Sequence, residues 1–141
     1  MEFVELEKEV GFELAVIFSL EKLSDDFWKE LHPTQLIKIY NKTEDYGLRD
    51  VREKIVSKID RLKLIHSYSE WRRLYDLAPD RSSLKTKALE EISVLAENLQ
   101  QYLEVLKLAP SGSVIHKKMF EKISNLVTVE EPNPFSQQTL R

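Results

Sequence analysis

The chain has 141 residues, of which 42% are hydrophobic and 32% charged, and its formal net charge is −3. This length is sufficient for one domain with its own core, and the scarcity of glycine, with only three residues, favours a soluble helical protein. Cysteine is absent, which excludes disulfides, zinc sites with thiolate ligands and a thiol nucleophile. No apolar run is as long as a membrane span, and the acidic N-terminus does not resemble a signal peptide, so we expect a cytoplasmic protein.

Charge is unevenly distributed along the chain. Residues 1–31 carry nine acidic and three basic side chains, whereas residues 42–87 carry twelve basic and eight acidic ones. Acidic residues such as Asp76 and Asp80 lie between the basic ones. The simpler interpretation of the basic middle is therefore a set of solvated helix faces, and the alternative is a surface for nucleic acid.

Helices are expected over residues 3–31. The stretch from residue 3 to residue 23 is apolar on more than one face, which indicates a helix that is buried or shared with a partner. The β-branched and aromatic content of residues 12–18 leaves a strand as the alternative there. Ser24 and the two aspartates after it are typical of a helix start, and Pro33 suits the first turn of the next helix.

A degenerate helical repeat is expected at about residues 34–60. Two apolar stripes with helical spacing lie on either side of residues 43–47, which form the expected turn. The stripes consist of Leu36, Ile39 and Tyr40, followed by Val51, Ile55 and Ile59.

Farther along the chain, residues 71–96 and 102–127 align without a gap at a constant offset of 31 residues. The two copies share an Ala-Pro pair and a serine, at Ala78, Pro79 and Ser82 in the first and at Ala109, Pro110 and Ser113 in the second. A tandem offset of this size indicates a short supersecondary unit that stacks on its own copy.

Each copy is predicted to form two helices joined by a short turn. The first, helix A, should end near Ala78 or Ala109, because the proline that follows disfavours helical backbone before it and lacks an amide donor. The second, helix B, should start at Ser82 or Ser83 in the first copy and at Ser113 in the second, where the hydroxyl can accept hydrogen bonds from free amides.

The helices of both copies carry apolar stripes that need to be covered, which predicts a continuous core along stacked hairpins. Asn98 is the expected exit from the first helix B. The stripes are Trp71, Leu74, Tyr75, Ala78, Leu84, Ala88, Ile92, Leu95 and Ala96 in the first copy, and Tyr102, Val105, Leu106, Ala109, Ile115, Met119, Ile123, Leu126 and Val127 in the second.

This pattern of an aromatic start, an Ala-Pro turn, a serine and an apolar second helix resembles the HEAT- and ARM-like α-solenoids of bacteria. The resemblance covers Trp71 to Val127 well and the rest of the chain poorly. It implies an all-α, right-handed stack of antiparallel helical hairpins, an α-α superhelix of about seven helices. We expect one domain over residues 1–129 and a flexible tail over residues 130–141.

No catalytic, cofactor-binding or metal-binding motif is recognisable. His32, His66 and His116 do not follow a metal-ligand spacing, and neighbouring carboxylates such as Glu90 and Glu91 cannot face each other on a helix. The Ser-Gly-Ser sequence at 111–113 lacks the frames of a nucleophile elbow and of a phosphate loop, so a turn with a helix cap is expected. We therefore expect a protein that is not an enzyme and that uses no cofactor or metal.

One cluster of basic residues near aromatic side chains is a candidate surface for an anionic partner. The simpler interpretation places Trp71 in the core and the basic groups in water. The cluster consists of Arg72, Arg73, Arg81, Lys85 and Lys87.

The resemblance to helical repeats implies binding of another macromolecule and supplies no catalytic residues. We therefore expect a protein-protein interaction or adaptor module with a protein partner, without a membrane partner, and with the N-terminal helix as a cap or a homodimer contact. The alternative is a small nucleic-acid-associated or toxin-neutralising regulator that binds through the basic middle segment.

Overall fold

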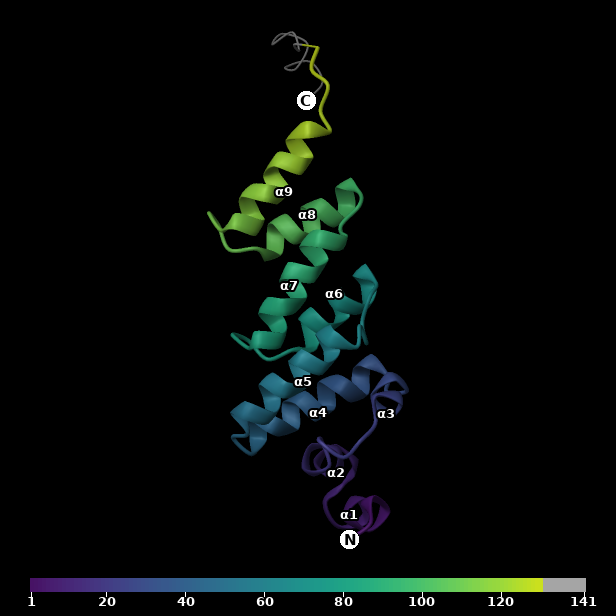
Figure 1. Ribbon diagram of the computed structural model, residues 1–141. Helices are drawn as coiled ribbons and strands as arrows, with labels where there is room; N and C mark the ends of the chain where they lie inside the picture. Colours follow the sequence, from purple (N-terminus) through teal and green to yellow (C-terminus); the bar gives the residue numbers. More distant parts are fainter. Residues whose placement is uncertain (131–141) are drawn as a thin grey trace. The chain divides into compact units, whose positions relative to one another are not determined.

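The structure, a computed structural model, describes residues 1–130, and these residues form nine α-helices and no strands (Figure 1). The chain divides into two compact units, residues 1–95 and residues 96–141. The all-α prediction is confirmed, but the number of helices is nine in the described part rather than about seven. The predicted tail over residues 130–141 lies, apart from Glu130, outside the described residues.

The first unit begins with three short helices, where one long helix and a helix start at Ser24 were expected. They are α1 (Phe3–Val10), α2 (Phe12–Phe18) and α3 (Asp25–Lys29). Gly11, at φ 90°, separates α1 from α2 in a backbone conformation that other residues rarely adopt, and this break is one reason for the higher helix count. Residues 12–18 are helical, so the strand alternative is wrong, and Ser24 caps α3 as predicted, with its Oγ 3.2 Å from the Phe27 amide.

The degenerate repeat forms a helical hairpin of α4 (Pro33–Asp45) and α5 (Arg49–Arg61). Pro33 occupies the first turn as expected, and the His32 Nδ1 atom accepts a hydrogen bond from the Thr34 amide at 3.1 Å. Five of the six predicted stripe residues are buried, and Val51 is half-buried. The five are Leu36, Ile39, Tyr40, Ile55 and Ile59.

The first copy of the tandem repeat folds as α6 (Tyr68–Leu77) and α7 (Ser83–Leu95). Helix α6 ends where predicted, because Ala78, before the proline, has extended backbone at φ −70° and ψ 144°. The Ser82 amide donates to the Pro79 carbonyl at 3.2 Å, and Ser82 Oγ accepts from the Lys85 amide at 3.1 Å to cap α7. Most of the predicted stripe is buried, including Trp71 at 3% exposure.

The second copy lies in the second unit and repeats this local geometry. It consists of α8 (Leu99–Leu108) and α9 (Val114–Asn125). Ala109 ends α8 with φ −71° and ψ 140°, and Ser113 Oγ accepts from the His116 amide at 3.2 Å to cap α9. The residue before the capping serine is left-handed in both copies, Arg81 at φ 61° and Gly112 at φ 79°. The hairpin prediction is therefore confirmed for each copy separately.

Two predictions for the tandem repeat are wrong in detail. Helix α7 already ends at Leu95, and Asn98 instead begins α8, where its side chain accepts from the Gln101 amide at 3.0 Å. Leu126 and Val127 were expected in the buried stripe, yet they are 56% and 59% exposed. Both residues follow the last residue of α9, so the helical spacing that would turn them toward the core no longer applies.

Within the first unit, α4 is the central helix. It contacts α2, α5 and α6, while α5 also contacts α7, so the α4–α5 and α6–α7 hairpins lie against each other (Figure 1). The two clear repeats fall in different units, α6–α7 in the first and α8–α9 in the second. A single repeat domain over residues 1–129 and its superhelical path therefore stay predictions.

Candidate interaction surfaces

The predicted basic cluster lies around the turn between α6 and α7, but three of its five members are engaged within the protein. Arg72 forms an ion pair with Asp76 on the same helix, and its guanidinium carbon lies 5.7 Å from the centre of the Tyr75 ring. Lys85 Nζ donates to the Tyr75 carbonyl at 3.0 Å, lies 4.4 Å from the centre of the same ring, and is 3.4 Å from an Asp80 carboxylate oxygen. Lys85 therefore places its positive charge at the C-terminal end of α6, where the last backbone carbonyls of the helix favour a cation.

Lys87 is the third engaged member. Its Nζ lies 3.0 Å from Asp60 of α5 and 3.0 Å from Glu91 of its own helix. The hydrogen bond to Asp60, followed by the one to Glu91, raises the pKa of Lys87 above its ordinary value, and partial burial opposes them. The side chain thus connects α5 with α7 and stays charged at neutral pH.

Arg73 and Arg81 are the two exposed members of the cluster. Among the described residues, neither forms an ion pair with a carboxylate. Each phosphate contact contributes separately to the affinity for nucleic acid, so two free arginines offer less than the five basic residues that the sequence suggested.

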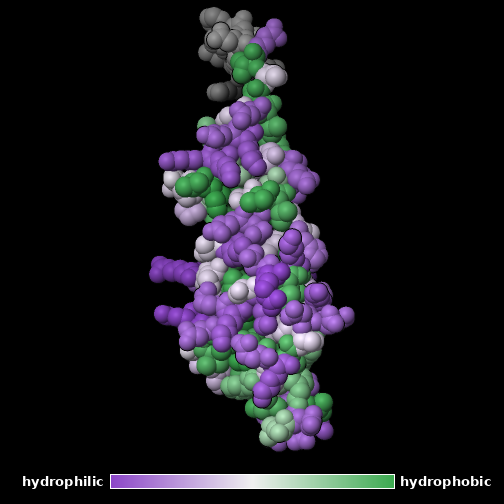
Figure 2. Space-filling model, viewed as in Figure 1, coloured by the Kyte–Doolittle hydropathy of each residue, from purple (hydrophilic) through white to green (hydrophobic). Residues whose placement is uncertain are grey.

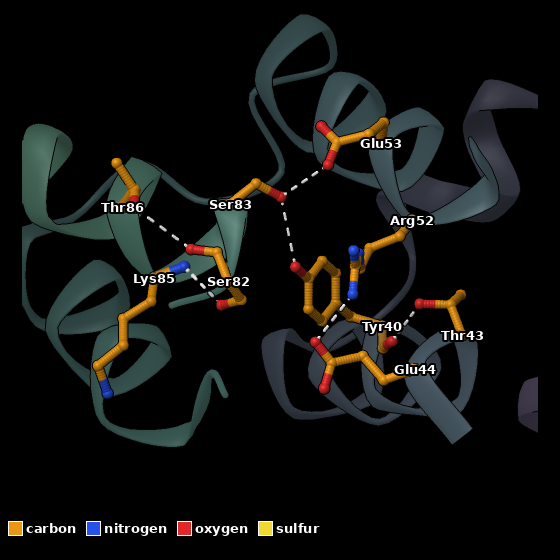
Figure 3. Close-up of polar contacts among 9 residues, drawn as sticks. All are labelled: Tyr40, Thr43, Glu44, Arg52, Glu53, Ser82, Ser83, Lys85 and Thr86. Carbon is orange, nitrogen blue, oxygen red and sulfur yellow. Dashed lines mark hydrogen bonds and ion pairs between the residues drawn. The ribbon is translucent and has the colours of Figure 1, made fainter. Parts of the chain in front are cut away.

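A polar bridge connects α7 with the α4–α5 hairpin behind this turn (Figure 3). Ser83 Oγ donates to Glu53 Oε1 at 3.0 Å and lies 3.3 Å from the hydroxyl of Tyr40, which is fully buried. No local sequence pattern indicates this bridge, because the partners of Ser83 lie 30 and 43 residues away along the chain. A hydrogen bond to a buried tyrosine hydroxyl fixes how one hairpin lies on the other.

Small hollows lie in the first unit. One, of about 210 Å³, is bordered by Asp60, His66, Trp71 and Glu91, and another, of about 320 Å³, is bordered by Glu44 and two arginines of α5. Small-molecule sites commonly occupy about 300 to 1,000 Å³. Both hollows are therefore at or below the small end of that range.

The side chains of His32 and His66 have local contacts in the structure. His32 caps α4 through Nδ1, and the Nδ1 atom of His66 lies 2.8 Å from the Lys63 carbonyl oxygen. Residues 1–130 contain no group of three or more histidine, aspartate or glutamate side chains placed to hold a metal ion.

An apolar surface on the second hairpin was not anticipated from the sequence. Phe120 and Ser124 lie four residues apart on one side of α9, and Val127 follows the end of the helix. All three are exposed, and we call them the open face of α9. Phe120 is 62% exposed and Val127 is 59% exposed. Figure 2 shows hydrophobic side chains at the surface over α8 and α9.

In the first copy of the repeat, the positions that match the open face are more deeply buried. The residues at the matching positions are Leu89, which is half-buried, and Ser93 and Ala96, which are each 5% exposed. Helix α8 is also more apolar than its counterpart, since Leu99 and Leu103, at 46% and 44% exposure, replace Tyr68 and Arg72. The alignment of the two copies already shows these apolar replacements in the second copy. Only the tertiary structure shows which of the positions are covered and which are exposed.

Comparison of the chain with protein-family models, curated proteins and solved structures finds no significant match. The relation to HEAT- and ARM-like repeats therefore stays a prediction. None of the helices in the described part of the chain combines the length and the apolar character needed to cross a bilayer.

Proposed function

We propose that the protein is a non-catalytic protein-protein interaction or adaptor module, a right-handed stack of HEAT-like helical hairpins. The open face of α9 carries this proposal. A large aromatic side chain, Phe120, is exposed at a position where the first copy of the repeat has a half-buried leucine.

The apolar character of this surface supports a protein partner. Aromatic anchors dominate the energetics of protein interfaces, and contiguous apolar patches on a soluble protein commonly mark interaction sites. Covering Phe120 and Val127, which are 62% and 59% exposed, with a partner removes apolar surface from water.

The alternative function, binding of nucleic acid or another anionic partner through the basic segment, depends on Arg73 and Arg81. Arg72, Lys85 and Lys87 already interact with carboxylates of the same chain, so their charges are partly neutralised. Replacing Arg73 and Arg81 with glutamine tests this alternative without disturbing those three contacts.

The test is an affinity capture with the tagged full chain, in which Phe120→Glu is compared with wild type. Val114→Glu is the matched control, because Val114 is 81% exposed on the same helix but six residues away, on another side of it. We expect Phe120→Glu to lose the captured protein, while Val114→Glu and the double arginine variant retain it after nuclease treatment. Loss with the arginine variant and retention with Phe120→Glu would instead support the anionic-partner function.

A further inference from the structure

We propose that two copies of the chain associate through the open faces of α9, with the two helices antiparallel about a two-fold axis. This inference rests on the proposed function, because it names the occupant of the same surface. It follows from the side of α9 on which Phe120 lies and from the two opposite charges beside it.

The open face lies on the side of α9 where a further helical hairpin would pack. In the first copy of the repeat, Lys87 of α7 contacts α5, and Leu89, two residues later, lies on nearly the opposite side of the helix. Phe120 occupies the position that matches Leu89. In a stack of hairpins, the side away from the preceding hairpin is the one that a following hairpin covers. The position of the open face therefore suits contact with a helix, and a second copy of the chain supplies one.

Two exposed side chains of opposite charge lie beside Phe120. Lys117 and Glu121 are four residues apart and lie along the same edge of the open face. Neither side chain forms an ion pair within residues 1–130. A surface that carries both charges along one edge is able to complement a second copy of itself.

The direction of pairing follows from the order of these charges along the helix. In an antiparallel pair, a two-fold axis level with Met119, midway between Lys117 and Glu121, brings Lys117 of each copy beside Glu121 of the other. In a parallel pair, Lys117 would face Lys117 and Glu121 would face Glu121, and like charges across an interface are unfavourable. Of the two arrangements, the antiparallel one therefore forms two ion pairs and avoids the repulsion.

The same axis brings the two Phe120 side chains together. Phe120 is one residue from the level of the axis, a distance of about 1.5 Å along the helix. Each ring, now 62% exposed, would be covered by the other copy, and aromatic residues near the centre of an interface contribute most to affinity. Because both open faces are used in this isologous contact, assembly stops at the dimer.

Sedimentation velocity of the full chain tests the dimer at about 1 to 500 µM, because a contact formed by one helix of each copy is small and small interfaces are weak. We expect wild type to form a dimer and no larger species. Phe120→Glu, Lys117→Glu and Glu121→Lys should each raise the dissociation constant at least about tenfold, since each brings an unfavourable charge into the contact.

Lys118→Glu is the matched control for Lys117→Glu. It changes the net charge by the same amount, but Lys118 is two residues from Phe120 and lies on nearly the opposite side of α9. This variant should dimerise like wild type. Equal weakening by both lysine variants would overturn the proposed contact, because net charge alone would then explain the effect.

The decisive samples recombine the two charge reversals. A mixture of Lys117→Glu and Glu121→Lys should form a heterodimer, because two acidic side chains on one copy then face two basic ones on the other. The variant that carries both changes has only exchanged the two charges, so it should form a homodimer again. If wild type associates but the mixture or the double variant stays monomeric, the antiparallel contact is overturned.

A wild type that is monomeric at every concentration would also overturn the dimer, as would assemblies larger than a dimer. The proposed function would still stand in either case if Phe120→Glu lost a captured protein. Circular dichroism of each variant establishes that the helices are retained.

Discussion

Trp71 and Ile92 lie in the interior of the α6–α7 hairpin, with 3% and 0% of their surface exposed. Both belong to stripes set by helical spacing, so a residue three or four positions away shares their side of the helix. Lys85 and Lys87 lie on the same hairpin but have partners that spacing does not indicate, the carbonyl end of α6 and a carboxylate of α5. Apolar residues in this hairpin follow their local pattern, whereas the roles of charged residues depend on distant neighbours.

Replacing Trp71 or Ile92 with alanine should therefore destabilise the protein. Removal of a large buried side chain loses its transfer free energy and leaves a cavity, at a cost of about 2 to 5 kcal/mol in the free energy of unfolding. Chemical denaturation monitored by circular dichroism measures this cost. Val94→Ala is the matched control on α7, because Val94 is 69% exposed and its truncation should change stability by less than about 0.5 kcal/mol. Unchanged stability of both core variants would contradict the packing of this hairpin.

At the scale of single helices, the starts and ends follow from a few side chains. Helix α6 begins with a capping box in which Ser67 Oγ accepts from the Glu70 amide at 3.1 Å and the Glu70 carboxylate accepts from the Ser67 amide at 3.3 Å. Helix α8 uses Asn98 and Gln101 at the matching positions, although Gln101 reaches the Glu97 amide instead. The two starts thus also differ in the charge of the third helical residue, which is a carboxylate in α6 and a neutral amide in α8.

The carboxylate makes the α6 start sensitive to pH. Burial alone would raise the pKa of Glu70, but hydrogen bonds from the side chain and amide of Ser67 and from the backbone of His66, with the charge of His66, together lower it. A lowered pKa in the folded state stabilises the protein above the unfolded value, near 4.3 for glutamate, and this stabilisation is lost as pH falls through the folded value.

We expect Glu70→Gln to be less stable than wild type at neutral pH, because the charged acceptor is lost. The difference in the free energy of unfolding should shrink as the medium is acidified, since Glu70 itself then becomes neutral. Denaturation of both proteins over a series of pH values, from neutral downward, measures how the difference changes as Glu70 is protonated. A difference that does not change with pH would show that the charge of Glu70 does not contribute.

For the whole molecule, the distribution of buried side chains differs between the two units. Among the largest fully buried side chains of residues 1–130, only Val105 and Met119 belong to the second unit, whereas the others, such as Trp28 and Tyr40, belong to the first. Regions with few buried apolar contacts open at lower free energy than the rest of a protein.

Native-state hydrogen exchange should therefore show weaker protection of amides in α8 and α9 than in α4 and α7 of the first unit. Equal protection of both units would contradict this expectation.

The sequence by itself determined the local structure of this protein. The Ala-Pro pairs ended α6 and α8 where predicted, and Ser24, Ser82 and Ser113 began the helices that follow them. These features were predictable because each depends on backbone and side chains within four residues of one another. The hairpins and most of their buried stripes follow from the same short-range spacing.

Only the tertiary structure decided which of these surfaces are available. Asp60, which pairs with Lys87, and Glu53, which accepts from Ser83, both belong to α5, about 30 residues earlier in the chain, and no local pattern indicates such pairs. Likewise, Phe120 and Leu89 occupy the same position of the repeat, yet only one of them is half-buried. Helical periodicity fixes the side of a helix on which a residue lies, but whether that side is covered depends on which other element packs there.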